Sequence, residues 1–251
     1  FFELLKFHRE DTGEIELAKR KGRRVFVLFI QEFREVLAVV NKVCEQWKPY
    51  YTNRGRMDLA YMAFYYGVGD TSTPMLVEAT GRHPRELVDK LVEELTRIQE
   101  RYREMKTRVS EAKISPTHHS TEMRELREIS GLSYVPFDGH QSRLAHYFRN
   151  LFQLIKYLSA HGPSREKLDY ADIVRAQLSN HEQALFCLNA LTKLGNAWLT
   201  EHYLDDYQLI KNIPKSFFNP LTELDLKETF PKVRFEFEKR EASFDERNDD
   251  D

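Results

Sequence analysis

Histidine and arginine side chains that could act on a phosphodiester lie in two segments of the chain. One pair is His146 and Arg149, and the other is Arg175 and His181. In metal-independent ribonucleases a histidine serves as general acid or base, and an arginine stabilises the charge that develops on the phosphorane. These four residues are therefore the candidate catalytic groups, and any enzymatic activity is expected to be metal-independent RNA cleavage.

The spacing of these pairs only partly fits ribonucleases of the HEPN class, in which the arginine precedes the histidine. Five residues separate Arg175 from His181, but six steps of about 100° put them on different sides of a straight helix. Ala176 also stands where that class usually has a polar residue. His146 and Arg149 share a helix face in the reverse order. Whether the protein is an enzyme at all stays open.

Other polar residues stand in apolar helical segments around these pairs. A buried polar group needs a hydrogen-bond or charge partner, because leaving it unpaired costs several kcal/mol. We expect a binding site or a structural network, and we expect burial between helices rather than an exposed face around His146. A buried Arg175 would need a carboxylate, with Asp138, Asp172 and Glu182 as candidates. The predicted network comprises Asp138, His140, Gln141, Arg143, Asn150, Gln153, Gln177, Ser179, Asn180 and Glu182.

The elements that position these residues are predicted to be almost entirely helical. Gly and Pro are sparse, and the apolar residues recur at helical spacing. The fold class is therefore all-α, a multi-helix bundle with a protruding charged helix or helical hairpin and minor β content at most near the C-terminus. The expected helices cover Arg24–Trp47, Met57–Tyr66, a stripe from Leu87 to Val109, Ser142–Ala160, Arg165–Ala197 and Trp198–Ile213, and the expected strand covers Lys232–Phe237.

The organisation predicted from composition is one helical domain over residues 1–237. A charged helical insertion is expected at about 83–130, and a disordered acidic tail at 238–251. Formal charge is only -2, so there is no strong nucleic-acid signature. Cys44 and Cys187 are expected to be reduced cytoplasmic thiols, and no metal or cofactor is expected. No apolar run reaches the roughly 20 residues of a membrane span, so membrane attachment is expected only through a segment preceding residue 1.

The string Pro136-Phe137-Asp138-Gly139-His140-Gln141-Ser142-Arg143-Leu144-Ala145-His146-Tyr147-Phe148-Arg149-Asn150-Leu151-Phe152-Gln153 resembles the signature of the putative phage abortive infection family related to AbiC. The resemblance continues at 175–182, where the family more often has Tyr at the position of His181, and at 209–213. Residues 57–70 and 1–5 are also similar to the family.

The resemblance implies a bacterial anti-phage protein that stops growth or kills the infected cell. It also implies a cytoplasmic portion of an anchored protein, at the inner face of the cell membrane. The usual Tyr at position 181 favours His140, Arg143, His146 and Arg149 if chemistry exists. Two hypotheses remain: a helical sensor or scaffold that recognises a phage component and acts through partner binding or homo-oligomerisation, and an HEPN-like toxin that cleaves host RNA.

Overall fold

The computed structural model describes residues 24–45, 51–111, 124, 134–161 and 167–238. The chain divides into two compact units, Phe1–Leu144 and Ala145–Asp251, and the helix that contains the boundary begins in the first and continues in the second. All regular secondary structure in the described ranges is helical. The predicted all-α fold class is therefore confirmed.

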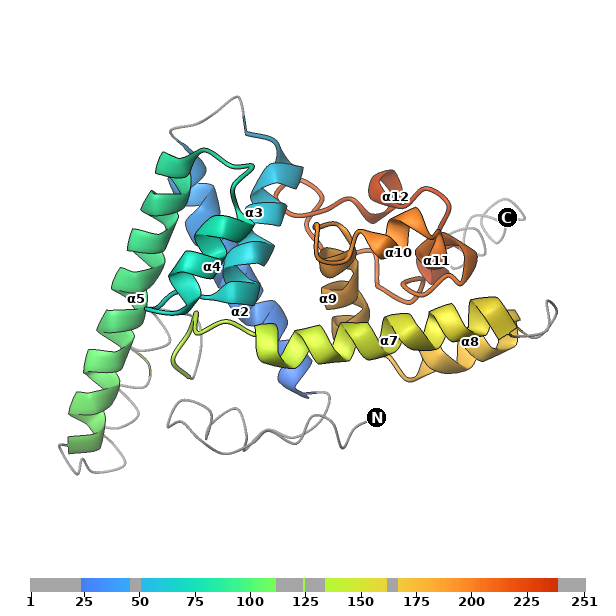
Figure 1. The fold of residues 1–251 in the computed structure, drawn as a ribbon, viewed down its shortest axis with the longest axis horizontal. Helices are drawn as coiled ribbons and strands as arrows, with labels where there is room; N and C mark the ends of the chain where they lie inside the picture. Colours follow the sequence, from blue (N-terminus) through green and yellow to red (C-terminus); the bar gives the residue numbers. More distant parts are fainter. Residues whose placement is uncertain (1–23, 46–50, 112–123, 125–133, 162–166, 239–251) are drawn as a thin grey trace, which may run out of the picture. The chain divides into compact units, whose positions relative to one another are not determined.

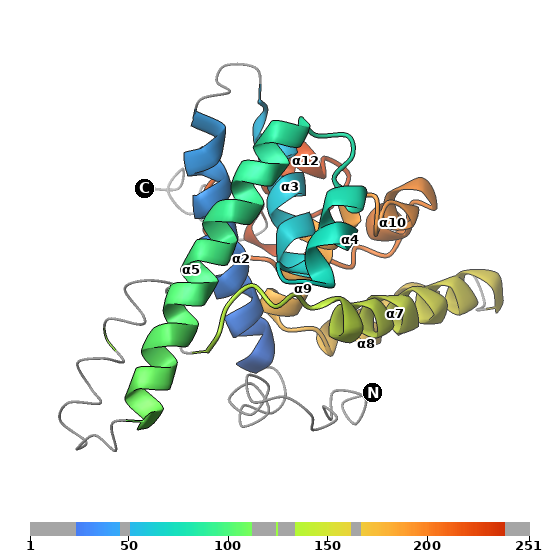
Figure 2. The same cartoon turned by 60° about the vertical axis from the view of Figure 1, so that its left-hand side comes forward.

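The first unit is built around helix α2 (Arg24–Cys44), which packs against α3 (Asn53–Tyr66) and α5 (Arg85–Glu111). The short helix α4 (Ser72–Ala79) contacts α3 and α5 (Figures 1 and 2). These four helices enclose the aromatic core of the unit.

Local sequence explains these helices. Every residue of α3 from Met57 to Tyr65 is buried, so this helix is surrounded on all sides. It begins where the Thr52 side chain accepts a hydrogen bond from the Gly55 N–H, and it ends at Gly67. The apolar stripe predicted on α5 is buried at Leu87, Leu91, Leu95 and Tyr102.

The second unit contains most of α7 (Gln141–His161) and the shorter helices that follow it. Helix α9 (Asn180–Ala190) is buried from Glu182 to Ala190, so this segment runs through a core. The other helices are α8 (Lys167–Ala176), α10 (Ala197–Thr200), α11 (Tyr203–Asp206) and α12 (Leu226–Thr229).

Three predicted elements in this unit were wrong. The single helix predicted over 165–197 is broken after Ala176, because Ser179 caps a new helix, α9. The helix predicted over 198–213 is two short helices interrupted at His202, whose φ of 58° is left-handed. No strand exists in the described ranges, and 232–237 buries Val233 and Phe235 without pairing to another strand.

The single domain over 1–237 and its insertion at 83–130 stay predictions. Of the tail predicted to be disordered, all but Glu238 lies outside the described residues, as do residues 1–23. Within the part of the chain that the structure describes, no helix combines the length and the hydropathy that a membrane crossing needs.

Candidate functional site

A fully buried glutamate lies at the centre of the first unit. Glu32 on α2 is 0% exposed and accepts three hydrogen bonds. The Tyr134 hydroxyl donates at 2.5 Å, the Phe137 N–H at 2.8 Å, and His140 Nε2–H at 2.7 Å. The His140 ring is also enclosed by Phe29 and Phe64, with ring centroids 4.3 and 4.7 Å away. The carboxylate therefore fixes the segment before α7 to α2.

The electrostatics of this group favour an ionised carboxylate. Burial alone raises the pKa of Glu32, but His140 and the hydrogen bonds from Tyr134 and Phe137 lower it by more, so its pKa lies below the ordinary 4.5. The pKa of the Tyr134 hydroxyl is raised well above its ordinary value, by burial first and then by Glu32. Tyr134 therefore stays protonated at neutral pH and donates a hydrogen bond to Glu32.

Two glycines allow the segment before α7 to pass the end of α3 with the two backbones in contact. We call residues 134–140 the crossing segment. Gly67 and Gly139 have φ of 75° and 85°. Val68 N–H donates to the Phe137 carbonyl and His140 N–H to the Tyr65 carbonyl, each at 2.8 Å. A Cβ on Gly67 would lie 2.4 Å from the Asp138 carbonyl carbon, and one on Gly139 would lie 2.3 Å from the Tyr66 oxygen. Only glycine fits both places.

Asp138 links α5 to the crossing segment through hydrogen bonds. Its Oδ1 accepts hydrogen bonds from Gln99 at 2.9 Å and Arg103 at 2.8 Å, and Gln99 also donates to the Pro136 carbonyl. Burial raises the pKa of Asp138, and Arg103 opposes the rise only in part. Of the predicted network, Asp138, His140 and Arg143 thus lie together, since Arg143 Nη1 lies 3.3 Å from His140 Nδ1.

The predicted buried arginine lies in the second unit. Arg175 is 4% exposed, and its Nη2 donates to Asp172 at 2.5 Å. Its Nη1 donates to the backbone carbonyls of Tyr207 and Gln208 at 3.4 and 3.3 Å. Asp172 is therefore the carboxylate partner among the three that the sequence offered. The guanidinium holds the α11 segment against α8.

Glu182, another of the three carboxylates considered as partners of Arg175, has a different role. Its carboxylate accepts from the Ser179 N–H at 2.8 Å and from the Tyr147 hydroxyl at 3.1 Å. The Ser179 hydroxyl accepts in return from the Glu182 N–H, which completes a capping box at the start of α9. This cap separates α8 from α9, so Arg175 and Glu182 do not lie on one continuous helix.

The second candidate catalytic pair is consequently divided between two helices. Arg175 lies near the end of α8 and His181 near the start of α9. The His181 ring packs edge-on against Phe217, with centroids 5.2 Å apart. The Arg175 guanidinium binds Asp172 and two backbone carbonyls. Both side chains thus make packing contacts within the second unit, and their catalytic role stays a prediction.

The first candidate pair lies in solvent. His146, Arg149, Asn150 and Gln153 are all exposed on α7, and so is Gln141 at its start. The expected burial of this face was wrong. The aromatic and aliphatic residues that suggested it pack on the opposite side of α7, where Tyr147, Phe148, Leu151 and Ile155 are buried. His146 and Arg149 are therefore available to a partner.

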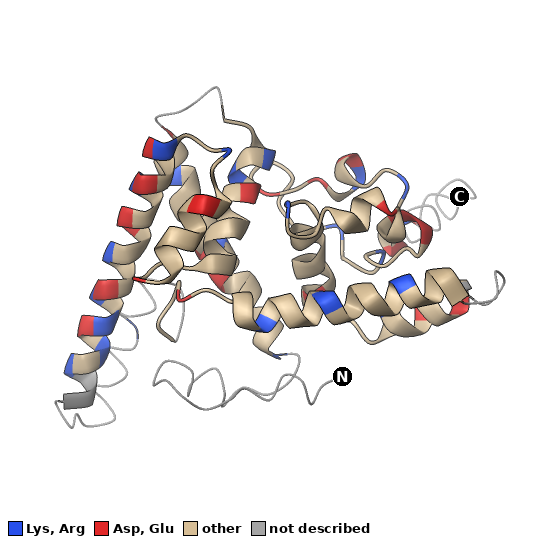
Figure 3. Ribbon diagram, viewed as in Figure 1, with Lys and Arg blue, Asp and Glu red and all other residues tan. Residues whose placement is uncertain are grey.

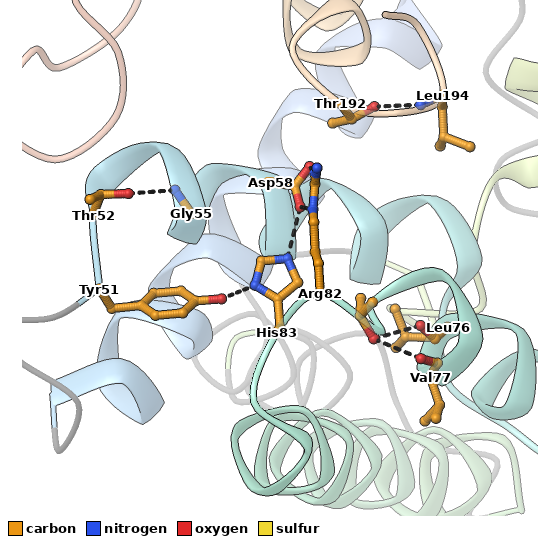
Figure 4. Close-up of polar contacts among 11 residues, drawn as sticks. Tyr51, Thr52, Gly55, Asp58, Leu76, Val77, Arg82, His83, Thr192 and Leu194 are labelled. Carbon is orange, nitrogen blue, oxygen red and sulfur yellow. Dashed lines mark hydrogen bonds and ion pairs between the residues drawn. The ribbon is translucent and has the colours of Figure 1, made fainter.

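Sequence reasoning missed a second polar cluster in the first unit (Figure 4). Asp58 Oδ2 accepts hydrogen bonds from Arg82 Nε at 2.9 Å and His83 Nε2 at 2.8 Å, while Tyr51 binds the other ring nitrogen of His83. Burial raises the pKa of Asp58, but His83 and Arg82 lower it by more. A carboxylate inside the apolar aromatic run of α3 was the signal that could have found this cluster.

These groups do not assemble a metal site or a reactive thiol. In the described ranges, no group of three or more His, Cys, Asp and Glu side chains could hold a metal ion. Burial raises the pKa of the Cys44 thiol to about 11 and that of Cys187 further, so both thiols stay protonated at neutral pH.

The capping box gives a local stability prediction. Replacing Ser179 by Ala is expected to lower the free energy of unfolding by about 1 kcal/mol, because α9 loses the hydroxyl that caps it. Thermal and urea unfolding of purified protein measure this loss. Ser142→Ala, an exposed serine in the first turn of α7, is the matched control and should change stability by less than about 0.5 kcal/mol. Equal stability of both variants would contradict the role of the cap.

The fold and its buried polar groups thus define an all-α protein. The buried polar residues of 136–153 and 175–182 mainly connect helices and segments through hydrogen bonds. Residues 139–218 match the family model of the putative phage abortive infection protein. The predicted relationship to this family is confirmed over these residues, which include α7, α8 and α9. No curated protein and no solved structure matches the chain.

Proposed function

We propose that this chain is an anti-phage defence protein that acts by abortive infection, as a helical sensor or effector that works through contacts with other macromolecules rather than through catalysis. The proposal extends the family match over 139–218 to a mechanism. We further propose that it works in the cytoplasm, where a phage component is the candidate trigger.

The observation that supports a non-catalytic role is where the polar side chains of the matched segment make their hydrogen bonds. His140 binds Glu32, Arg175 binds Asp172 and two carbonyls, and Glu182 binds Ser179 and Tyr147. Groups that are buried and paired in this way stabilise packing and have no access to substrate. The buried polar residues of the matched segment therefore stabilise the fold, and other, exposed residues are left to contact a partner.

The residues it presents are on the exposed face of α7, which includes His146 and Arg149. We propose that this face contacts the partner. The same exposure favours one alternative function, a metal-independent HEPN-like toxin acting on host RNA, because the two side chains are three residues apart and project from one helix face.

Defence is tested by plating phage on cells that carry the full-length protein with His146→Ala or Arg149→Ala. We expect each change to raise the plating efficiency at least about tenfold, because a lost partner contact of about 1.4 kcal/mol weakens binding tenfold. Lys193→Ala is the matched control, an exposed cation inside the matched segment. Protein level and melting temperature should not change. Full protection by both folded variants would exclude a functional role of this α7 face.

The ribonuclease alternative has its own readout. Purified protein, wild type beside His146→Ala/Arg149→Ala, is incubated with total cellular RNA and tRNA, with and without lysate of infected cells as a source of the trigger. We expect intact RNA in every lane. Cleavage by the wild type that disappears in the variant would replace the non-catalytic proposal by the toxin.

A further inference from the structure

The second unit carries a concentrated group of exposed apolar side chains on α7 and α8. Seven large hydrophobic residues are exposed in the described ranges, and five of them lie between 154 and 173. Isolated exposed hydrophobics are ordinary, whereas a cluster on one surface marks an interaction site. The five are Leu154 (38% exposed), Tyr157 (62%), Leu168 (55%), Tyr170 (45%) and Ile173 (59%).

The two helices present these residues together. Helices α7 and α8 lie side by side in both views of the chain (Figures 1 and 2). Leu154 and Tyr157 are three residues apart on α7, and Tyr170 and Ile173 are three apart on α8, so each pair lies on one side of its helix. Ala171 and Arg175 are buried on the other side of α8. Leu168 lies on the same stripe of α8 as Ala171 and Arg175, so we leave it out and name the exposed surface of 154–157 and 169–173 the α7–α8 face.

Charge is segregated between the two helices of this face. Helix α7 contains no Asp or Glu and exposes Arg149 and Lys156, whereas α8 exposes Asp169 and Asp172 (Figure 3). Asp172 is already bonded to Arg175, which leaves Asp169 as the main acidic group for a partner. A partner that offers an acidic helix beside a basic one fits both helices.

A second copy of the same chain offers that combination. In a two-fold symmetric interface both copies use the same surface patch. Each contact between α7 of one copy and α8 of the other is therefore repeated by symmetry. Like charges oppose pairing of α7 with α7, whereas the α7 with α8 arrangement places Lys156 of each copy near Asp169 of the other. The apolar side chains then fill the centre and the charges lie at the rim.

We propose that the α7–α8 face is a homodimer interface in which α7 of each copy packs against α8 of the other. This inference deepens the proposed function, for which oligomerisation is one route. The oligomeric state is measured without phage, so the two proposals can fail separately. A monomeric protein would overturn the dimer and leave the proposed defence role intact. A dimer that gives no protection would overturn the defence role and leave the dimer intact.

The first test is the mass of the full chain in solution by light scattering and native mass spectrometry, for wild type and Ile173→Arg. We expect a wild-type dimer and at least about a hundredfold weaker association for Ile173→Arg, since a charge is buried against apolar side chains. Leu221→Arg is the control, an exposed leucine outside the face, and should stay dimeric. A monomeric wild type, or a dimer that Ile173→Arg does not weaken, overturns the proposal; the face then serves a different partner.

A charge exchange tests the proposed pairing directly. Lys156→Glu opposes Asp169 in a homodimer, and Asp169→Lys opposes Lys156, so each variant alone should dimerise at least about tenfold more weakly. Mixed in equal amounts, the two variants restore both contacts and should form a heterodimer in native mass spectrometry. Both substitutions are at exposed positions, which keeps the fold intact. No preference for the heterodimer in the mixture would overturn the α7 with α8 arrangement.

Discussion

Replacing Glu32 by Gln is expected to lower the free energy of unfolding by about 3 kcal/mol, because it leaves a buried donor network without its anion. Tyr134, Phe137 N–H and His140 all donate to the Glu32 carboxylate. An amide has one acceptor oxygen and a donor NH₂ group, so at least one donor would face another donor. The melting temperature should fall by roughly 10 °C, as measured by calorimetry or circular dichroism.

The matched control on the same helix is Glu35→Gln. Burial raises the pKa of the half-buried Glu35, so its charged form is disfavoured in the folded state and a neutral amide should cost little. A melting temperature of Glu32→Gln within about 2 °C of the control, roughly the effect of 0.5 kcal/mol, would show that the carboxylate does not hold the crossing segment.

The same glutamate predicts a pH dependence. A carboxyl group with a lowered folded-state pKa stabilises the protein above its unfolded value, here 4.5, and loses that contribution as pH falls through the folded pKa. The stability difference between wild type and Glu32→Gln should therefore be constant near pH 7 and shrink below pH 4.5. Urea unfolding at a series of pH values measures it, and a difference that grows on acidification would contradict the sign.

Replacing Gly139 by Ala is expected to have an equal or larger effect, on the order of 3 kcal/mol or more, from two causes that add. The φ of 85° is unfavourable for alanine. The new Cβ would also lie 2.3 Å from the Tyr66 carbonyl oxygen and 2.9 Å from the Gly67 nitrogen, which are backbone atoms that cannot rotate away. We expect low yields of folded protein and a strongly reduced melting temperature.

Two other glycines separate these causes. Gly69 has a φ of 144° and an added Cβ would have no neighbour within 4 Å, so Gly69→Ala reports backbone strain alone. A Cβ on Gly81 would lie 3.5 Å from the Glu78 oxygen, an ordinary contact, so Gly81→Ala should be nearly neutral. Loss of stability in the order Gly139, Gly69, Gly81 is the expected result. Equal stability of the Gly139 and Gly69 variants would remove the steric argument.

Several features followed from the sequence because their causes are local. Helical spacing of apolar residues placed α2, α3, α5 and α7, since an amphipathic or fully apolar helix is encoded by neighbouring side chains. The need of a buried arginine for a carboxylate limited the expected partners of Arg175 to three, and the structure shows Asp172, three residues earlier, as the one that binds it. The string at 136–153 also identified the family that the chain resembles over 139–218.

Other features were decided by tertiary packing. The sequence did not indicate that Glu32 would meet His140, because the two are 108 residues apart and the contact depends on how α2 faces the crossing segment. The cap at Ser179 broke a helix that periodicity extended, since a serine hydroxyl satisfies α9 amides as well as another turn would. The exposure of His146 and Arg149 likewise depends on which side of α7 packs against apolar residues. That packing depends on the neighbouring segments and not on the sequence of α7 alone.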